Sequence, residues 1–150
     1  MEYQVTVQTV APQLIAAARQ RTTSRMISKK IGPLMSAPWT YLRAQPAFKP
    51  DGRNVAIYWD MRNGGSIEVG VEVTAPFDAT NDVVCSGTSG GTVAMTTHVG
   101  SYAQLGAAHD AVMAWSRQNA REIVMPFWEI YGHWDNDPAK VRTDVLYLLK

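Results

Sequence analysis

Alternation of apolar and polar residues is the dominant pattern in this chain of 150 residues, and it predicts β-strands along most of its length. The predicted strands are Glu2 to Val10, Gln13 to Arg19, Val55 to Asp60, Ile67 to Thr74, Val83 to Ser86, Thr92 to Val99, Pro126 to Trp134 and Val141 to Leu149. Asn63-Gly64-Gly65 lies between the third and fourth of these strands and predicts a tight hairpin, because these residues tolerate positive φ.

Two further segments have the features of helices. Ser101 can cap a helix in which apolar residues recur at helical spacing, namely Tyr102, Leu105, Ala108, Val112 and Trp115. The segment from Ser24 to Gln45 is also helical in character, but Pro33 and Pro38 fall inside it. Because proline lacks an N–H and clashes with the preceding turn, we expect this helix to be broken or kinked.

The order of elements repeats along the chain. Residues 1–76 and 83–150 each give a strand, a helix and a two-strand hairpin, which predicts two similar modules within one domain of residues 1–150. The alignment of the two halves places Ala56 against Glu129 and Tyr58 against Tyr131. The fold expected is therefore α+β, with the sheets of the two modules joined about a pseudo-twofold axis.

One predicted strand contains a carboxylate among large apolar side chains. In Phe127-Trp128-Glu129-Ile130-Tyr131, period-2 alternation puts Phe127, Glu129 and Tyr131 on one face. Such a glutamate either points to solvent from an edge strand or must be paired, because burying an unpaired charge is costly. Since the other half has Ala56 at the equivalent position, Glu129 breaks the symmetry of the repeat, which favours a functional role.

Composition excludes several classes of function. With 14 basic and 13 acidic residues, the formal net charge of +1 provides no field to attract a nucleic-acid backbone or an anionic membrane. The sequence contains no leader and no long apolar run, and the lone Cys85 cannot form an internal disulfide, so we expect a cytoplasmic protein. The three histidines, His98, His109 and His133, have no ligand spacing, so we expect no metal and no cofactor, with His109 packing or facing water.

The loop Gly87-Thr88-Ser89-Gly90-Gly91 matches the Gly-x-Ser-x-Gly nucleophile pattern only in letters. That motif needs a strand-to-helix elbow, whereas this loop leads into a predicted strand. We interpret it as a turn.

Several short motifs resemble a known family. Three of them are similar to the second half of the GyrI-like (gyrase-inhibitor-like) domain. They are Ser89-Gly90-Gly91 before a strand, Gly100-Ser101-Tyr102 at the start of a helix, and the strand from Phe127 to Tyr131. Glu68 to Val73 resembles a strand of its first half. The resemblance implies duplicated strand-helix-strand-strand modules, a pseudo-twofold antiparallel sheet with helices on one face, and a ligand groove between the halves.

The resemblance also implies candidate functions. GyrI-like domains occur alone or as effector-binding parts of AraC-type and MerR-type regulators, in which the glutamate matching Glu129 and the tyrosine matching Tyr131 lie in an aromatic pocket for cationic, hydrophobic compounds. Some stand-alone relatives are hydrolases that open cyclopropane rings in genotoxic compounds, and the family name suggests a protein-binding inhibitor of DNA gyrase. Because the first strand begins at Glu2, no room is left for a helix-turn-helix, and direct nucleic-acid binding is not expected.

The residue types give the expected site its chemistry. The candidate ligand-binding residues are Glu129, Tyr131, Phe127, Tyr58 and Trp39, because a carboxylate and aromatic faces both attract a cation. For an enzyme, Glu129 would be the general base and Tyr131 a hydrogen-bond donor, and burial among apolar groups is expected to raise the pKa of Glu129. The expected ligand is a hydrophobic compound, cationic or electrophilic, in a groove with Glu129 at its floor. The sequence does not separate binding of such a compound in drug sensing, sequestration or detoxification from its hydrolysis.

Overall fold

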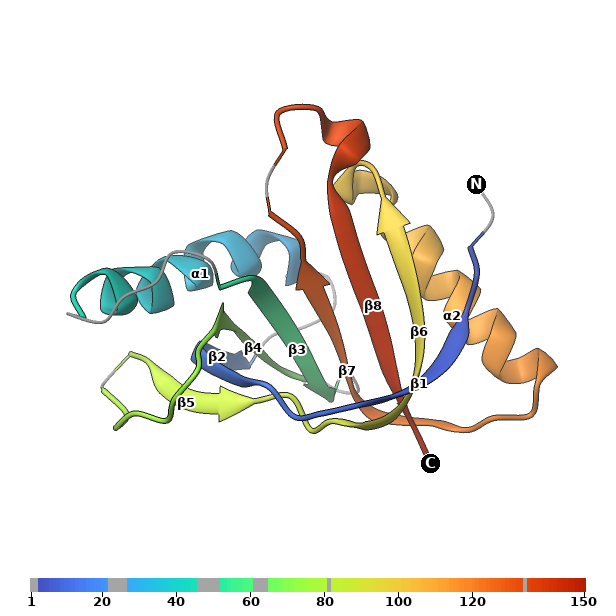
Figure 1. The fold of residues 1–150 in the computed structure, drawn as a ribbon, viewed down its shortest axis with the longest axis horizontal. Helices are drawn as coiled ribbons and strands as arrows, with labels where there is room; N and C mark the ends of the chain where they lie inside the picture. The colour runs from blue at the N-terminus through green and yellow to red at the C-terminus, as the bar shows by residue number, and fades with distance from the viewer. Residues whose placement is uncertain (1–2, 22–26, 46–51, 61–64, 81, 134) are drawn as a thin grey trace.

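The computed structural model describes residues 3–21, 27–45, 52–60, 65–80, 82–133 and 135–150. Its elements in chain order are β1 (Thr6–Val10), β2 (Leu14–Arg21), α1 (Ile27–Arg43), β3 (Asn54–Asp60), β4 (Ser66–Glu72), β5 (Val84–Gly87), β6 (Gly91–Val99), a short 3-10 helix (Tyr102–Gln104), α2 (Gly106–Gln118), β7 (Ile123–Tyr131), a second 3-10 helix (Pro138–Lys140) and β8 (Arg142–Leu149). Figure 1 shows the strands side by side in one sheet, with the two long helices over different parts of it.

The sheet has eight strands in the order β1-β6-β8-β7-β3-β4-β2-β5, and neighbouring strands are antiparallel throughout. The units β2-α1-β3-β4 and β6-α2-β7-β8 have the same order of elements and meet at the pair β3 and β7. The predicted α+β fold with duplicated modules and a pseudo-twofold sheet is therefore confirmed.

Each half contributes its leading strand to the other half. β1 precedes β2 in the chain but pairs with β6, and β5 precedes β6 but pairs with β2. The two connections run side by side (Figure 1), where Gln13 N–H donates to Thr88 Oγ1 at 2.9 Å and Thr88 N–H donates to the Gln13 carbonyl at 3.0 Å. Gly90 has a φ of 66° here, and a Cβ on it would lie 2.7 Å from the Pro12 nitrogen, so this crossing requires glycine.

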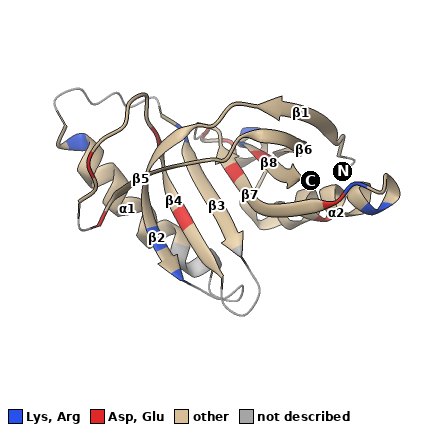
Figure 2. Ribbon diagram, turned by 90° about the horizontal axis from the view of Figure 1, so that it is seen from below, with Lys and Arg blue, Asp and Glu red and all other residues tan. Residues whose placement is uncertain are grey.

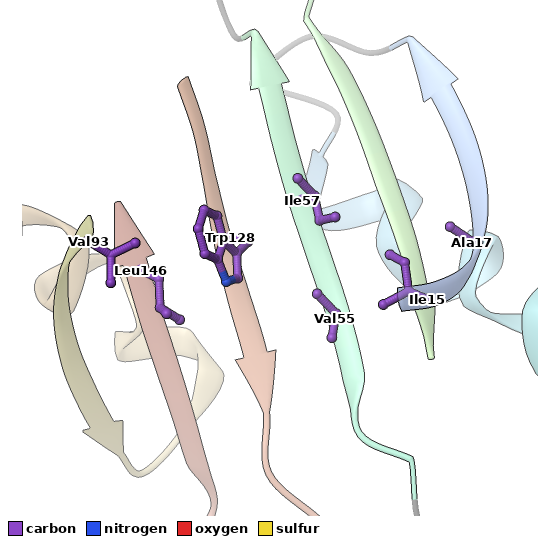
Figure 3. Packing of buried hydrophobic residues seen from close by; sticks show 7 residues of the cluster. All are labelled: Ile15, Ala17, Val55, Ile57, Val93, Trp128 and Leu146. Carbon is purple, nitrogen blue, oxygen red and sulfur yellow. The ribbon is translucent and has the colours of Figure 1, made fainter. Parts of the chain in front are cut away.

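Apolar residues form cores on both faces of the sheet. On the face without helices, one cluster spans β2, β3, β6, β7 and β8, and Figure 3 shows its seven labelled side chains around Trp128. On the other face, α2 packs through Ala108 and Val112 on β6 and β8, while α1 packs through Ile31, Leu34 and Met35 on β3 and β4. Both helices thus cover one face, α1 over the first half and α2 over the second.

The helix α1 corrects one expectation. It runs without interruption from Ile27 to Arg43, although Pro33 and Pro38 lie inside it, so of the two expected outcomes the break is wrong and the kink stays a prediction. A proline inside a helix costs about 3 kcal/mol. Packing of the partly buried Ile31, Leu34 and Met35 on the sheet works against this cost, because the burial of apolar surface is favourable.

Most other element predictions are confirmed, with shifts at the ends. β1 begins at Thr6 rather than Glu2, and β7 covers Ile123 to Tyr131 rather than Pro126 to Trp134. Ser101 caps the short 3-10 helix before α2, where its hydroxyl accepts from Ala103 N–H at 3.2 Å. Ser24, where the helical segment is expected to begin, and Asn63 and Gly64 of the predicted hairpin turn lie outside the described residues.

Candidate functional site

The strand β7 lies between β8 and β3 near the middle of the sheet, not at an edge. Glu129 points from it to the helix-covered face and is only 4 % exposed. Phe127 and Tyr131 flank it on the same face, as the alternation predicts. The interpretation of Glu129 as a solvent-facing residue of an edge strand is therefore excluded.

A ladder of aromatic rings lies beside the carboxylate. Tyr58 on β3, Phe127 on β7 and Tyr147 on β8 stand directly opposite one another in the strand registers. Their rings stack at centroid distances of 4.6 Å for both neighbouring pairs, with interplanar angles of 12° and 11°. Because facing side chains on neighbouring strands are within contact distance, strand pairing alone brings these rings together.

Glu129 accepts hydrogen bonds at both carboxylate oxygens. Oε1 accepts from the hydroxyls of Tyr58 at 2.7 Å and Tyr131 at 2.6 Å. Oε2 lies 2.6 Å from Nε2 of His109, which must donate because an ionised carboxylate only accepts. The other ring nitrogen of His109, Nδ1, lies 2.6 Å from the hydroxyl of Tyr147, so the chain of contacts runs from Tyr147 through His109 to Glu129.

The pseudo-twofold axis passes through this site. Ala56 stands directly opposite Glu129 in the pairing of β3 with β7, and the sequence repeat makes the same two residues equivalent. Tyr58 and Tyr131, also equivalent in the repeat, lie on either side of this pair and donate to the same oxygen. The two halves therefore supply matching tyrosines to one carboxylate, which only the second half carries.

Hydrogen bonding keeps the carboxylate ionised. Burial by itself would raise the pKa of Glu129, but the hydrogen bond and charge of His109, with the hydroxyls of Tyr131 and Tyr58, hold it below its ordinary value. The expectation of a raised pKa is wrong, because it considered the apolar neighbours and not these donors. Burial and the charge of Glu129 raise the pKa of Tyr58, Tyr131 and Tyr147, so all three hydroxyls stay protonated donors.

His109 and Tyr147 are site residues that the sequence interpretation missed. The inward face of α2 carries Ala108 and Val112, and His109 lies next to the first and three residues before the second. Helical spacing places His109 close to the buried apolar face of the helix. A polar side chain beside that face was the feature of the sequence that could have indicated a site residue. Tyr147 could be found only from the register of β8 against β7, which the sequence does not specify.

Two aromatic residues lie farther from the carboxylate. Tyr102, in the 3-10 helix before α2, is exposed and makes an edge contact with Tyr131 at 5.7 Å between centroids. Trp39 on α1 donates from Nε1 to Asn54 Oδ1 at 2.8 Å, and Arg43 lies over its ring. Because Asn54 is opposite Tyr131 on β3, its contact with Trp39 is at the far end of the site from Phe127.

The arrangement suits a cation better than a metal or an anion. An ionised carboxylate without a Lys or Arg partner among the described residues attracts positive charge, and aromatic rings add cation–π attraction. Within the same part of the chain, no group of three or more His, Cys, Asp or Glu side chains has the geometry of a metal site. No described helix is long and apolar enough to cross a membrane.

Glu129 is nearly inaccessible to solvent in this structure, with 4 % of its surface exposed. Two surface hollows lie elsewhere, one of about 350 Å³ along β1 and β6 and one of about 460 Å³ beside Arg19, Trp59 and Glu68. Glu129 lines neither of them. Because the Glu129 side chain is only 5 % exposed, a ligand can contact the carboxylate only if neighbouring side chains move, and His109 is the more exposed member of the pair at 20 %.

Comparisons with known proteins find proteins of similar structure. No protein-family model and no curated protein matches the chain. The EcmrR C-terminal domain superposes with a TM-score of 0.81 and 17 % identity, over 100 % of this chain and 99 % of that domain. In the complex of EcmrR with DNA the TM-score is 0.80 at 15 % identity, over 99 % of this chain, which spans only 57 % of that longer one.

Two further neighbours have other descriptions. SAV2435 bound to tetraphenylphosphonium superposes with a TM-score of 0.71 and 16 % identity, over 100 % of this chain and 94 % of that one. A hydrolase from Listeria innocua has a TM-score of 0.62 and 10 % identity, over 98 % of this chain and 92 % of that one. Together these likenesses show that the chain has the fold of the GyrI-like effector-binding domains.

Proposed function

We propose that this protein binds hydrophobic, cationic small molecules on the helix-covered face of the sheet, with Glu129 as the group that attracts the charge. The observation that carries the proposal is a buried carboxylate whose partners among the described residues are tyrosine hydroxyls and a histidine, not a permanent cation. Its lowered pKa keeps it ionised near neutral pH. A monovalent cation in contact with it would gain roughly 4 kcal/mol at about 4 Å.

The shape of the site supports a hydrophobic ligand. Tyr58, Phe127 and Tyr147 offer a stacked aromatic surface, and Tyr102 adds an exposed ring near Tyr131. Such rings bury apolar area of a ligand, and a cation over the exposed ring of Tyr102 would gain roughly 0.5 to 2 kcal/mol from a cation–π contact. The likeness to SAV2435, which was solved with tetraphenylphosphonium, is consistent with this ligand class. The binding would serve drug sensing, sequestration or detoxification.

Titration with tetraphenylphosphonium tests this proposal through quenching of tryptophan fluorescence. We expect saturable binding to the wild type and a loss of about 100-fold or more in affinity for Glu129→Gln, which removes the charge and keeps the shape. Triphenylphosphine oxide, a neutral compound of similar bulk, should bind the two proteins equally.

The matched control is Glu68→Gln. Glu68 is also a buried carboxylate, but it lies on the opposite face beside Arg19 and Trp59, so its loss should leave the affinity unchanged. Equal affinity of the wild type and Glu129→Gln for tetraphenylphosphonium would remove the electrostatic role assigned to Glu129.

Hydrolysis is the second candidate, and the His109–Glu129 pair favours it. A carboxylate hydrogen-bonded to a histidine can accept a proton from water during attack on an electrophilic ring, and the Listeria hydrolase shares the fold. The lowered pKa makes Glu129 a weaker base, which is why binding is the preferred function. If Glu129→Gln opened a cyclopropane-bearing substrate as fast as the wild type, this candidate would fail.

A further inference from the structure

We propose, on the basis of the binding function above, that His109 makes the site a proton–cation exchanger. In this mechanism a ligand cation replaces the positive charge of a protonated His109 beside Glu129, so that binding releases a proton and strengthens as the pH rises.

The first argument is the occupancy of the carboxylate. A carboxylate has about four acceptor positions on its two oxygens. Tyr58 and Tyr131 both donate to Oε1, so this oxygen has no position left for a ligand. Oε2 has a single described donor, Nε2 of His109. A ligand that contacts Glu129 must therefore do so at Oε2, directly beside His109.

The second argument is access. The side chain of Glu129 is 5 % exposed, whereas that of His109 is 20 % exposed. Phe127 meets the imidazole edge-on at 5.7 Å between centroids, as does Tyr147 at 5.6 Å. A shift of the imidazole away from Oε2 would open an aromatic surface and a carboxylate at the same time.

The third argument is the charge of the two protonation states. With neutral His109, the Tyr147 hydroxyl donates to Nδ1, and the His109–Glu129 pair has a net charge of −1. With protonated His109, both ring nitrogens donate and the pair is neutral. Histidine is the side chain that ordinarily changes charge between about pH 5 and 8.

No other group described around His109 duplicates this role. The titratable groups that face it are Glu129 from β7 and Tyr147 from β8, with Asp110 adjacent on α2 itself and Tyr102 in the preceding 3-10 helix. No Lys or Arg of the described residues bonds to His109 or Glu129. The tyrosine hydroxyls have raised pKa values and do not titrate in this range.

Linkage sets the size of the effect. If one proton leaves for each cation bound, the affinity rises up to about tenfold per pH unit while His109 is mostly protonated, and it levels off once His109 is neutral. By the same reciprocity, bound cation makes His109 harder to protonate. A neutral ligand does not compete for charge and should show no comparable dependence on pH.

The test is a titration of the wild-type protein with tetraphenylphosphonium at a series of pH values from about 5 to about 8, since this cation does not itself titrate. Calorimetry in buffers of different ionisation enthalpy counts the protons released. We expect the affinity to rise at least about tenfold across the series and up to one proton to be released per cation at the acidic end. This measurement on the wild type needs no variant to fold.

The variant His109→Gln keeps an amide donor for Glu129 but cannot take up a proton, so its affinity should be nearly independent of pH. The matched control is His133→Gln, an exposed histidine beyond the end of β7, which should behave as the wild type does. Binding that is independent of pH in the wild type, or a pH dependence that persists in His109→Gln, would overturn the exchange and leave the proposed binding function intact. Absence of binding at every pH would overturn both.

Discussion

Two buried glutamates on opposite faces of the sheet show how a structural carboxylate differs from a candidate site. Glu129 on β7 is 4 % exposed and Glu68 on β4 is 2 % exposed, and Figure 2 shows an acidic position on each of these strands. Arg19 donates from Nε to Glu68 at 3.0 Å, and Trp59 donates from its indole N–H. Glu129 has hydroxyls and an imidazole instead.

The type of partner decides what each carboxylate can do. Arginine stays charged at all ordinary pH values, so the Glu68 pair is already neutral and offers a second cation little. The second half repeats this solution, because Asp144 is bonded by Thr97 Oγ1 at 2.8 Å and by Arg142 Nε at 3.2 Å. Partners that are neutral or titratable leave the charge of Glu129 available for a ligand.

The largest difference in stability is expected between Glu68→Gln and Glu129→Gln. We expect Glu68→Gln to lower the free energy of unfolding by about 1 to 3 kcal/mol, because charge-assisted hydrogen bonds from Arg19 and Trp59 are weakened. The lower part of the range applies if the Arg19 side chain, 59 % exposed, is rehydrated. Glu129→Gln should cost about 1 kcal/mol, since the amide oxygen can still accept from both tyrosines and only the acceptor for His109 is replaced by an NH2 group. Urea denaturation measures both values, and a larger loss in Glu129→Gln would reverse the comparison.

A smaller effect is expected from removing single hydroxyls around Glu129. Tyr58→Phe and Tyr131→Phe each delete one donor to Oε1, so each should raise the pKa of Glu129 and lower stability by about 1 kcal/mol. Tyr147→Phe is the control, because its hydroxyl contacts His109 and not the carboxylate. NMR titration of the glutamate side-chain carbons measures the pKa. If Tyr58→Phe and Tyr131→Phe leave the pKa of Glu129 unchanged, the two hydroxyls do not both donate to Oε1.

The smallest effect is expected in the acid dependence of stability. Because the pKa of Glu129 is lower in the folded protein than in the unfolded chain, its contribution is fully present above the unfolded value of about 4.3 and is lost as the pH falls through the folded value. Stability of the wild type should therefore decline more steeply than that of Glu129→Gln below about pH 5. Denaturation series at successive pH values compare the two slopes, and parallel curves would contradict the lowered pKa.

Much of the site follows from short-range patterns in the sequence. Period-2 alternation put Phe127, Glu129 and Tyr131 on one face, and the repeat brought Tyr58 and Ala56 to the same region before any strand pairing was known. Both inferences use spacing along one segment or similarity between segments, which the sequence states directly.

The features of the structure that the sequence did not predict depend on which strands pair and in what register, and on whether tertiary packing outweighs local preferences. Tyr147 faces Phe127 only because β8 pairs with β7 in one particular register. His109 reaches Glu129 because α2 packs on β6 and β8, and that contact also reversed the expected direction of the pKa shift. In α1, packing on the sheet outweighed the local penalty of Pro33 and Pro38, which propensity alone could not indicate.

The exchange of β1 and β5 between the halves has a consequence for cooperativity. Each half supplies the edge strand that completes the sheet of the other, and the connections cross in contact at Gln13 and Thr88. The site needs both halves as well, with Tyr58 from one and Glu129 from the other. Neither half is therefore a self-sufficient folding unit. Unfolding of one half would remove the edge strand from the sheet of the other half and, at the same time, a hydrogen-bond donor to Glu129.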